Sequence, residues 1–199
     1  MTWLAASAAG LALAGCDRDG GRPAAAAFRN TDVTGADFGK DFSLVDHEGR
    51  PRTLSDFRGK VVTLFFGFTQ CPDVCPTSLA EMADAMKAMG PKAEQVQVLF
   101  VTVDPARDTP ALLKEYVPSF DPRFVGLTGT PEQVSQVAKE FRVFYQKVPG
   151  KTPDSYTIDH TAGTYVFDRE GRLRLFVKHG QGAEALAHDL SILVDAPKA

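Results

Sequence analysis

The chain of 199 residues contains only three cysteines, Cys16, Cys71 and Cys75. Disulfide scaffolds are denser in cysteine and usually hold an even number, so this class is excluded. A zinc ribbon is excluded too, because it needs four ligands in two spaced pairs. The sequence has no run of Lys or Arg, and its net charge is -3, which argues against a nucleic-acid binder. Each cysteine therefore needs its own explanation.

The first fifteen residues contain no charged side chain and end next to Cys16. Their apolar run, residues 4–13, is too short for a membrane-spanning helix, which needs about 20 residues, but it fits a signal peptide. Residues 13–16, Leu-Ala-Gly-Cys, resemble the bacterial lipoprotein box, in which the chain is cut before the cysteine and the cysteine is lipidated. An ordinary signal peptide or a frayed chain start remains the alternative. We expect a signal peptide over residues 1–15 and a lipid anchor at Cys16.

The rest of the chain divides into a tether and one domain. Residues 16–29 are rich in Gly, Ala, Arg and Pro, which is typical of a flexible linker. Residues 30–199 have the length of a single domain, since domains commonly hold about 100–150 residues. The whole chain is 44% hydrophobic and 24% charged, an ordinary globular composition.

The hydrophobic pattern predicts a mixed sheet with helices on its faces. Two near-continuous apolar runs, residues 61–68 and 97–103, favour strands buried on both faces. Thr109-Pro110 and Thr130-Pro131 each predict a helix start, with Thr as the N-cap and Pro in the first turn. A polar loop is expected over residues 149–157. The remaining strands are expected at 42–46 (in a hairpin), 124–128, 143–148, 164–167 and 173–177, and the helices at 76–89, 109–117, 130–141 and 183–194.

Cys71 and Cys75 lie between the first buried strand and the next helix. This places both thiols at the carboxyl edge of the sheet, where ligands tend to bind in open α/β folds. The partial positive charge of the helix N-terminus is expected to favour the thiolate over the thiol. The pair is therefore a candidate metal site and a candidate redox-active dithiol. A plain stabilising disulfide is the weaker alternative, because so short a loop gains little from closure.

Soft thiolates select soft metals, of which Cu(I) is the softest common candidate. Two thiolates leave room for a third ligand, and His160 is the obvious donor because it stands in a polar context before an expected strand. Asp159 beside it is expected to orient the imidazole. On residue type alone, an ordinary surface histidine is the better interpretation of His160. His47, His179 and His188 are interpreted as ordinary residues.

Four motifs together resemble the Sco/SenC family: Phe-Phe-Gly-Phe-Thr at 65–69 with Cys-Pro-Asp-Val-Cys-Pro at 71–76, Val-Asp-Pro-Ala-Arg-Asp-Thr at 103–109, Gly-Leu-Thr-Gly-Thr at 126–130, and Asp-His-Thr at 159–161. They follow the family order and span most of the domain. The resemblance implies a thioredoxin-like fold with an added N-terminal β-hairpin. It implies copper binding, as Cu(I) or Cu(II), by Cys71, Cys75 and His160. Asp104 and Asp108 belong to the signature, and we interpret them as turn and cap formers that also support the site.

The implied function is that of a copper metallochaperone which assists assembly of the CuA centre of cytochrome c oxidase. The implied partners are the oxidase subunit that carries CuA, a periplasmic copper donor, and the membrane through the lipid anchor. The expected location is the periplasmic side of the bacterial inner membrane. A thiol–disulfide reductase that keeps the oxidase cysteines reduced is the alternative. A peroxide-reducing enzyme is a third hypothesis, but it gives His160 no role.

Overall fold

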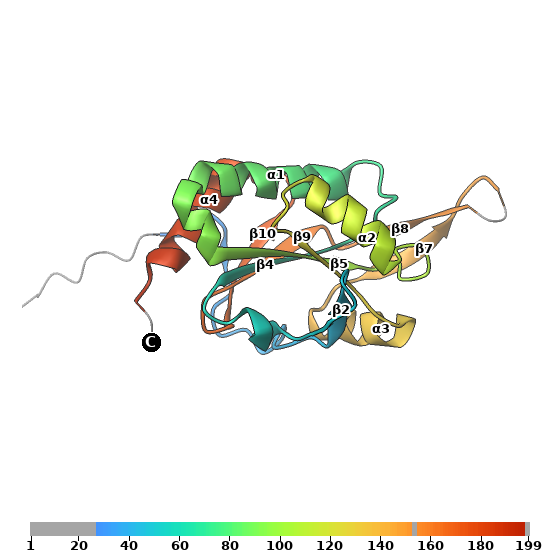
Figure 1. The fold of residues 1–199 in the computed structure, drawn as a ribbon, viewed down its shortest axis with the longest axis horizontal. Helices are drawn as coiled ribbons and strands as arrows, with labels where there is room; N and C mark the ends of the chain where they lie inside the picture. Colours follow the sequence, from blue (N-terminus) through green and yellow to red (C-terminus); the bar gives the residue numbers. More distant parts are fainter. Residues whose placement is uncertain (1–26, 153–154, 198–199) are drawn as a thin grey trace, which may run out of the picture.

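Two runs of seven residues form the middle of the protein's sheet. In the computed structural model, which describes residues 27–152 and 155–197, they are the parallel strands β4 (Val61–Gly67) and β5 (Val96–Thr102). Every residue of both strands is buried, because helices cover both faces of the sheet (Figure 1). The prediction of two buried central strands is confirmed.

Within the described residues, eight strands form one mixed sheet in the order β1-β10-β9-β4-β5-β6-β2-β3. β6 extends the parallel part, whereas β9, β10 and β1 add antiparallel strands on the other side of β4. β2 and β3 form the expected hairpin, which joins the sheet by pairing with β6. The expected mixed sheet is thus confirmed. The bounds are β1 (Thr31–Asp32), β2 (Leu44–Asp46), β3 (Pro51–Arg52), β6 (Val125–Thr128), β9 (Gly163–Phe167) and β10 (Leu173–Lys178).

The helices lie in two layers. α1 (Val74–Met89), α2 (Pro110–Tyr116) and α4 (Ala183–Asp195) cover one face of the sheet, and α3 (Pro131–Glu140) covers the other (Figure 1). Thr109 and Thr130 accept hydrogen bonds from helix N–H groups at the starts of α2 and α3, so the predicted caps are confirmed. Short 3-10 helices span residues 54–57, 90–95 and 117–119.

One element was wrongly predicted. The expected loop over 149–157 overlaps only the first two residues of a strand that was not predicted, β8 (Tyr156–His160), which pairs with β7 (Tyr145–Pro149). The residues of β8 are mostly polar, so their composition predicts a loop, but Ile158 is buried and its neighbours on either side are exposed. The β7–β8 hairpin extends from the end of the molecule near α2 (Figure 1). It matters for function because β8 ends at His160.

The predicted domain limits are partly outside the described residues. The expected signal peptide and the expected lipid anchor at Cys16 both fall there, and the division at 15/16 stays a prediction. At the end of the expected tether, the backbone N–H of Arg29 donates to the buried Asp189 of α4. No helix among residues 27–152 and 155–197 has both the length and the apolar character to cross a membrane.

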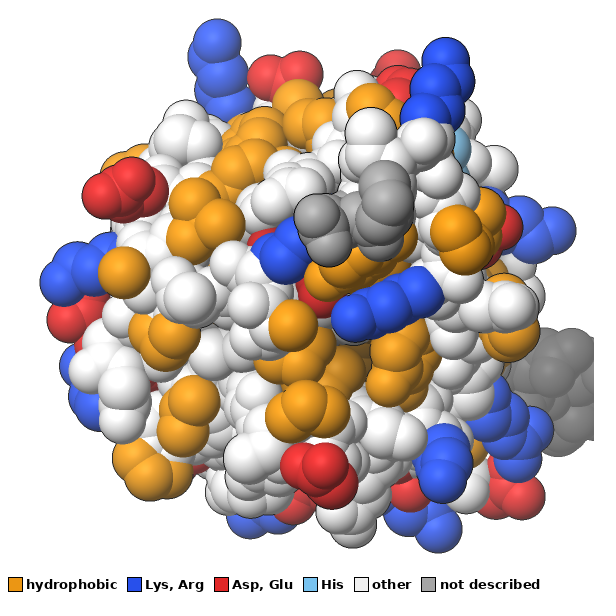
Figure 2. Space-filling view, turned by 90° about the vertical axis from the view of Figure 1, so that its right-hand side faces the viewer, with side chains coloured by type: hydrophobic (Ala, Val, Ile, Leu, Met, Phe, Trp, Pro, Cys, Tyr) orange, Lys and Arg blue, Asp and Glu red, His pale blue; other side chains and the backbone are white. Residues whose placement is uncertain are grey.

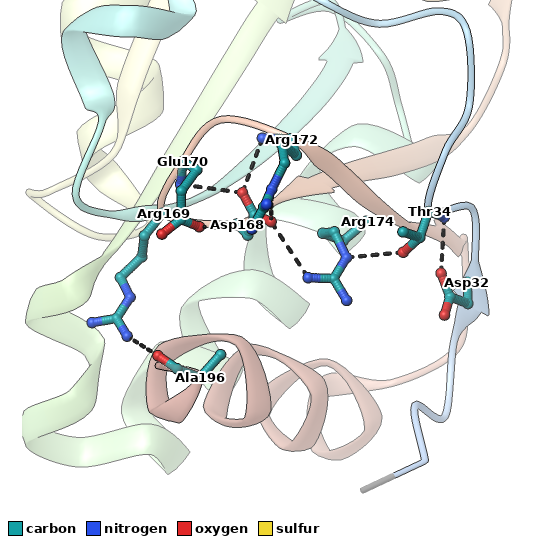
Figure 3. A network of polar contacts seen from close by, with 8 residues as sticks. All are labelled: Asp32, Thr34, Asp168, Arg169, Glu170, Arg172, Arg174 and Ala196. Carbon is teal, nitrogen blue, oxygen red and sulfur yellow. Dashed lines mark hydrogen bonds and ion pairs between the residues drawn. The ribbon is translucent and has the colours of Figure 1, made fainter. Parts of the chain in front are cut away.

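Away from the cysteines, the buried carboxylate of Asp168 holds together the turn between β9 and β10 (Figure 3). It accepts hydrogen bonds from the backbone N–H groups of Glu170 and Arg172 and from the Arg172 side chain, with Arg174 at 3.4 Å. Arg174 also donates to Thr34, which ties the turn to the N-terminal segment. Burial alone would raise the pKa of Asp168, but these hydrogen bonds outweigh it and lower the pKa.

Replacing Asp168 by asparagine is expected to destabilise the domain by about 2 kcal/mol at pH 7, since hydrogen bonds to a charged group each contribute about 1.5–3 kcal/mol. Because the pKa of Asp168 is lowered in the folded protein, its carboxylate stabilises the fold at pH values above the ordinary aspartate pKa. This stability is lost as the pH falls from the ordinary pKa through the lowered pKa of the folded protein. The difference between wild type and variant in urea unfolding should therefore shrink between pH 7 and pH 3. Asp84→Asn, at an exposed position on α1, is the control and should change little. An unchanged difference at pH 3 would contradict this assignment.

Candidate metal centre

The loop after β4 brings both cysteines to the carboxyl edge of the sheet. α1 begins at Val74, two residues earlier than expected, so Cys75 lies inside the first helical turn. The N-cap residue Asp73 makes no side-chain cap hydrogen bond. Instead, the backbone N–H of Cys75 donates to Cys71 Sγ at 3.4 Å. One sulfur therefore satisfies an N–H group that the helix start leaves unpaired.

The two thiols differ in exposure. Cys75 is fully buried, Cys71 is half-buried, and both are free thiols. Burial raises the pKa of Cys75 far above that of an ordinary thiol, which corrects the expectation that the helix N-terminus would favour a thiolate there. Burial therefore favours the thiol over the thiolate at Cys75. Coordination to a metal deprotonates such a thiol, because the ion supplies the compensating charge.

His160 reaches the thiols from the opposite side, at the end of β8. Its Nε2 lies 3.4 Å from Cys75 Sγ. The imidazole is packed against the edges of two aromatic rings, those of Phe65 and Phe68, with centroids 6.1 and 5.9 Å away. Burial among these rings lowers the pKa of His160, which favours the neutral imidazole that binds metals.

The residue that orients His160 is not the one expected. Nδ1 lies 3.0 Å from the carbonyl oxygen of Thr161, which leaves Nε2 directed at the sulfur. The side chain of Asp159 is exposed, so the structure gives the orienting role to the Thr161 carbonyl instead. The polar sequence around His160 does not reveal that the rings of Phe65 and Phe68 pack against its imidazole.

Together these residues form a group that could hold a metal ion. The Sγ atoms of Cys71 and Cys75 and a ring nitrogen of His160 all lie within 4.8 Å of one another. With metal–ligand bonds of about 2.0–2.3 Å, as for zinc, two donors on one ion stand at most about 4.6 Å apart, so donors within 4.8 Å of one another are close to the separations that one ion needs. Cys71 and His160 line a cavity of about 330 Å³, together with Phe68, Pro72 and Val74, whereas Cys75 lies buried behind them. The end of the molecule that Figure 2 shows carries hydrophobic side chains near its centre, with Lys and Arg among them.

The two aspartates of the signature, Asp104 and Asp108, form hydrogen bonds that hold the backbone next to the site. Asp108 is buried and accepts hydrogen bonds from the hydroxyls of Thr69 and Thr102, both at 2.6 Å, which joins the ends of β4 and β5. Burial nevertheless raises its pKa. Asp104 forms a turn, as predicted, because its carbonyl accepts the N–H groups of Arg107 and Asp108. The expected cap role belongs to Thr109 rather than to Asp108.

Gly67, which sequence reasoning passed over, gives Cys75 its space. A Cβ at this position would stand 2.9 Å from Cys75 Sγ and 2.8 Å from the Phe100 ring. Gly67→Ala is therefore expected to destabilise the domain by about 1–3 kcal/mol, as overpacking does. It should also weaken copper binding, because the sulfur must move. Urea unfolding and a copper titration check the two effects.

The matched control for Gly67→Ala is Gly126→Ala. A Cβ at Gly126 would stand 3.1 Å from Leu113, away from the thiols, so it tests crowding alone. It should lower stability but leave copper affinity unchanged. If the Gly67 variant keeps wild-type copper affinity, the claim that Gly67 shapes the site is wrong.

Related proteins help to interpret this geometry. The SCO1/SenC family model matches residues 30–195. The chain belongs to the SCO1/SenC family. A bovine relative, the mitochondrial SCO2 homolog, is 42% identical over 148 residues, which are 73% of this chain and 56% of the bovine protein. The matched part thus spans little more than half of that relative.

Solved SCO1/SenC structures share the fold. Bradyrhizobium japonicum ScoI with copper bound is 44% identical, with a TM-score of 0.72, covering 78% of this chain and 99% of that one. A SCO1/SenC family lipoprotein from Bacillus anthracis is 25% identical, with a TM-score of 0.70, covering 85% and 100%. The predicted thioredoxin-like fold is confirmed. The copper prediction is supported as well, since a copper-bound relative is known and the Cys-Cys-His group here is suited to copper.

Proposed function

We propose that this chain binds one copper ion, as Cu(I) or Cu(II), through Cys71 Sγ, Cys75 Sγ and His160 Nε2. The observation that carries the proposal is the convergence of these donors within 4.8 Å at an open cavity. Two soft thiolates suit Cu(I), and the imidazole adds the nitrogen ligand that Cu(II) favours. The copper held by the related ScoI supports the choice of metal.

The proposed role of the protein is to deliver its bound copper to another protein. We infer that the protein is a metallochaperone that assists assembly of the CuA centre of cytochrome c oxidase, as the family motifs imply. Its partners are then the oxidase subunit that carries CuA and a periplasmic copper donor. The open cavity beside the donors supports this role, because an incoming ligand can reach the metal without unfolding the site.

Attachment to the membrane is part of the proposal. The sequence around Cys16 supports a lipid anchor on the periplasmic side of the inner membrane, and the related protein from Bacillus anthracis is described as a lipoprotein. Metabolic labelling with a palmitate analogue tests the anchor. Label in the wild type that is absent from Cys16→Ser is the expected result, and an unlabelled wild type would overturn it.

The delivery role is tested by mixing the copper-loaded protein with the purified, copper-free oxidase subunit. The expected result is loss of copper from the donor and, once the mixture has been re-oxidised in air, the visible absorption of a mixed-valence CuA centre. A matched reaction with copper-loaded His188→Ala, altered at a histidine on α4, should behave as wild type. If copper stays on the donor under reducing conditions, the metallochaperone proposal is wrong.

A second function has its own support in the structure. The half-buried Cys71 and the buried Cys75 lie next to each other as free thiols, an arrangement typical of an attacking and a resolving cysteine. Cys71 as thiolate would attack a partner disulfide. That attack would break the partner S–S bond, release one partner sulfur as a thiolate and join the other to Cys71. Cys75 would then attack the Cys71 sulfur, pass its proton to the thiolates released and displace the second partner sulfur, leaving the partner reduced and the pair joined as a disulfide. Both functions could reside in one site.

His160 separates the two functions. Replacing it by alanine removes a metal ligand but leaves the dithiol, so reduction of an oxidised CuA-type peptide should persist while Cu(II) binding weakens. If the wild type reduces this peptide no faster than free glutathione does, the reductase alternative fails.

A further inference from the structure

The strand that carries His160 lies outside the main sheet. Among residues 27–152 and 155–197, β7 and β8 pair only with each other. A two-stranded hairpin alone is marginally stable in water. Other contacts must therefore hold it against the cysteine loop, and the geometry of the metal site depends on them.

Besides the buried Ile158, Arg107 on the loop after β5 makes several of these contacts. Its Nη1 donates to the backbone carbonyl of Tyr156, at the start of β8, at 2.9 Å. The same nitrogen donates to Gln70 Oε1 at 2.9 Å, beside Cys71. Its Nε donates to the buried carboxylate of Asp104. One guanidinium group thus joins the histidine strand, the cysteine loop and the end of the sheet.

The Tyr156 side chain completes the connection. The guanidinium carbon of Arg107 lies 3.6 Å from the centroid of the Tyr156 ring, which is a close cation–π contact. The Tyr156 hydroxyl donates to Asp104 Oδ1 at 2.8 Å. We name Asp104, Arg107 and Tyr156 the Arg107 latch. Its members hold both the backbone and the side chain at the start of β8.

A second path runs from Arg107 to the imidazole itself. The guanidinium carbon stands 5.8 Å from the Phe68 ring, and this ring packs edge-on against His160. The other guanidinium nitrogen, Nη2, is buried and has no hydrogen-bond partner among the described residues. The contact of Arg107 with the Phe68 ring thus links the guanidinium to the ring that packs against His160.

We propose that Arg107 is a positioning residue for the copper site: it fastens the β7–β8 hairpin to the cysteine loop and so keeps His160 Nε2 within reach of Cys75 Sγ. The effect on copper rests on the function proposed above, whereas the effect on the hairpin does not. Cu(II), which needs the imidazole, should depend on the latch, and Cu(I), which two thiolates can hold, should not.

The test measures Cu(I) and Cu(II) binding by the full chain and records the sulfur-to-copper absorption band. Arg107→Ala is expected to weaken Cu(II) binding about tenfold, the scale seen when a group that supports a metal ligand is lost. The absorption band should shift, and Cu(I) binding should be unchanged. Arg107→Lys should recover little, because an ammonium cannot make the forked contacts of a guanidinium. Arg172→Ala is the matched control, an arginine held by Asp168 and Glu170 in the remote turn of Figure 3.

A double variant decides whether Arg107 acts through His160. If it does, adding Arg107→Ala to His160→Ala should weaken Cu(II) binding no further. Equal losses of Cu(I) and Cu(II), or additive losses in the double variant, would overturn the proposal. Tyr156→Phe replaces Arg107→Ala in this test if the Arg107 variant fails to fold. It keeps the aromatic ring and removes only the hydrogen bonding to Asp104, so it should weaken Cu(II) binding by a smaller factor and leave Cu(I) binding unchanged.

Hydrogen exchange of the metal-free protein separates this proposal from that of copper binding. Arg107→Ala should speed exchange of the β7–β8 amides about tenfold and leave β4 and β5 unchanged, since only the hairpin loses its attachment. Arg172→Ala should leave the hairpin as in wild type. If the wild type binds no copper, the proposed function fails. The hydrogen-exchange rates of the β7–β8 amides then test the role of the Arg107 latch by themselves. Unchanged exchange in the hairpin would overturn the latch even if copper binds.

Discussion

Cys75→Ser should abolish copper retention. Cys75 Sγ is central to the site, because it lies 3.4 Å from His160 Nε2 and its own backbone N–H reaches Cys71 Sγ. A serine hydroxyl is a hard, neutral ligand in place of a soft thiolate. We expect both Cu(I) and Cu(II) affinity to fall by more than about 100-fold, beyond the loss caused by removing a group that only supports a ligand. Competition with a chelator of known affinity measures it.

The control for Cys75→Ser is the third cysteine of the chain. Cys16→Ser should leave the copper stoichiometry of the reduced protein unchanged, because the proposed site uses only Cys71 and Cys75. Both variants replace a cysteine by serine, but only Cys75→Ser changes a proposed copper ligand. Copper bound by Cys75→Ser with wild-type affinity would show that the ligand assignment is wrong.

His160→Ala should separate the two oxidation states of copper. Two thiolates alone can hold Cu(I), whereas Cu(II) favours added nitrogen ligands. We expect Cu(II) affinity to fall on the order of 100-fold, and Cu(I) affinity to change by less than about threefold. The loss for Cu(II) should exceed that of Arg107→Ala, since the ligand itself is removed. Paired titrations under reducing and non-reducing conditions give both values.

His188 provides the control for this variant. It lies on α4, where its Nδ1 is 2.8 Å from Asp189, and it belongs to no group of metal donors among the described residues. His188→Ala should leave both affinities as in wild type. If His160→Ala reduced Cu(I) and Cu(II) binding equally, the imidazole would be holding the site together rather than selecting an oxidation state.

Much of the fold follows from local sequence patterns. The buried strands β4 and β5 are apolar almost throughout, and Thr-Pro pairs mark the starts of α2 and α3, so each carries its own signal. The position of the dithiol at the sheet edge follows in the same way, since strand, loop and helix are consecutive. The His160 role, in contrast, was predicted only from the family motifs.

What the sequence could not show depends on contacts between distant residues. Strand β8 is mostly polar and is recognisable only from its pairing with β7. The raised pKa of Cys75 comes from burial under parts of the chain that surround it, and this outweighs the helix N-terminus from which a thiolate was expected. Arg107 contacts Tyr156 across 49 positions of sequence, so no local pattern reveals the latch.

The central claim is that Cys71 and Cys75 together hold one copper ion at the site that His160 completes, and a titration of the fully reduced chain with Cu(I) tests it most directly. The account predicts binding of one equivalent, preference for copper over zinc, and loss of that equivalent in both Cys71→Ser and Cys75→Ser. Binding of zinc with no preference for copper, or no binding of metal at all, would contradict it.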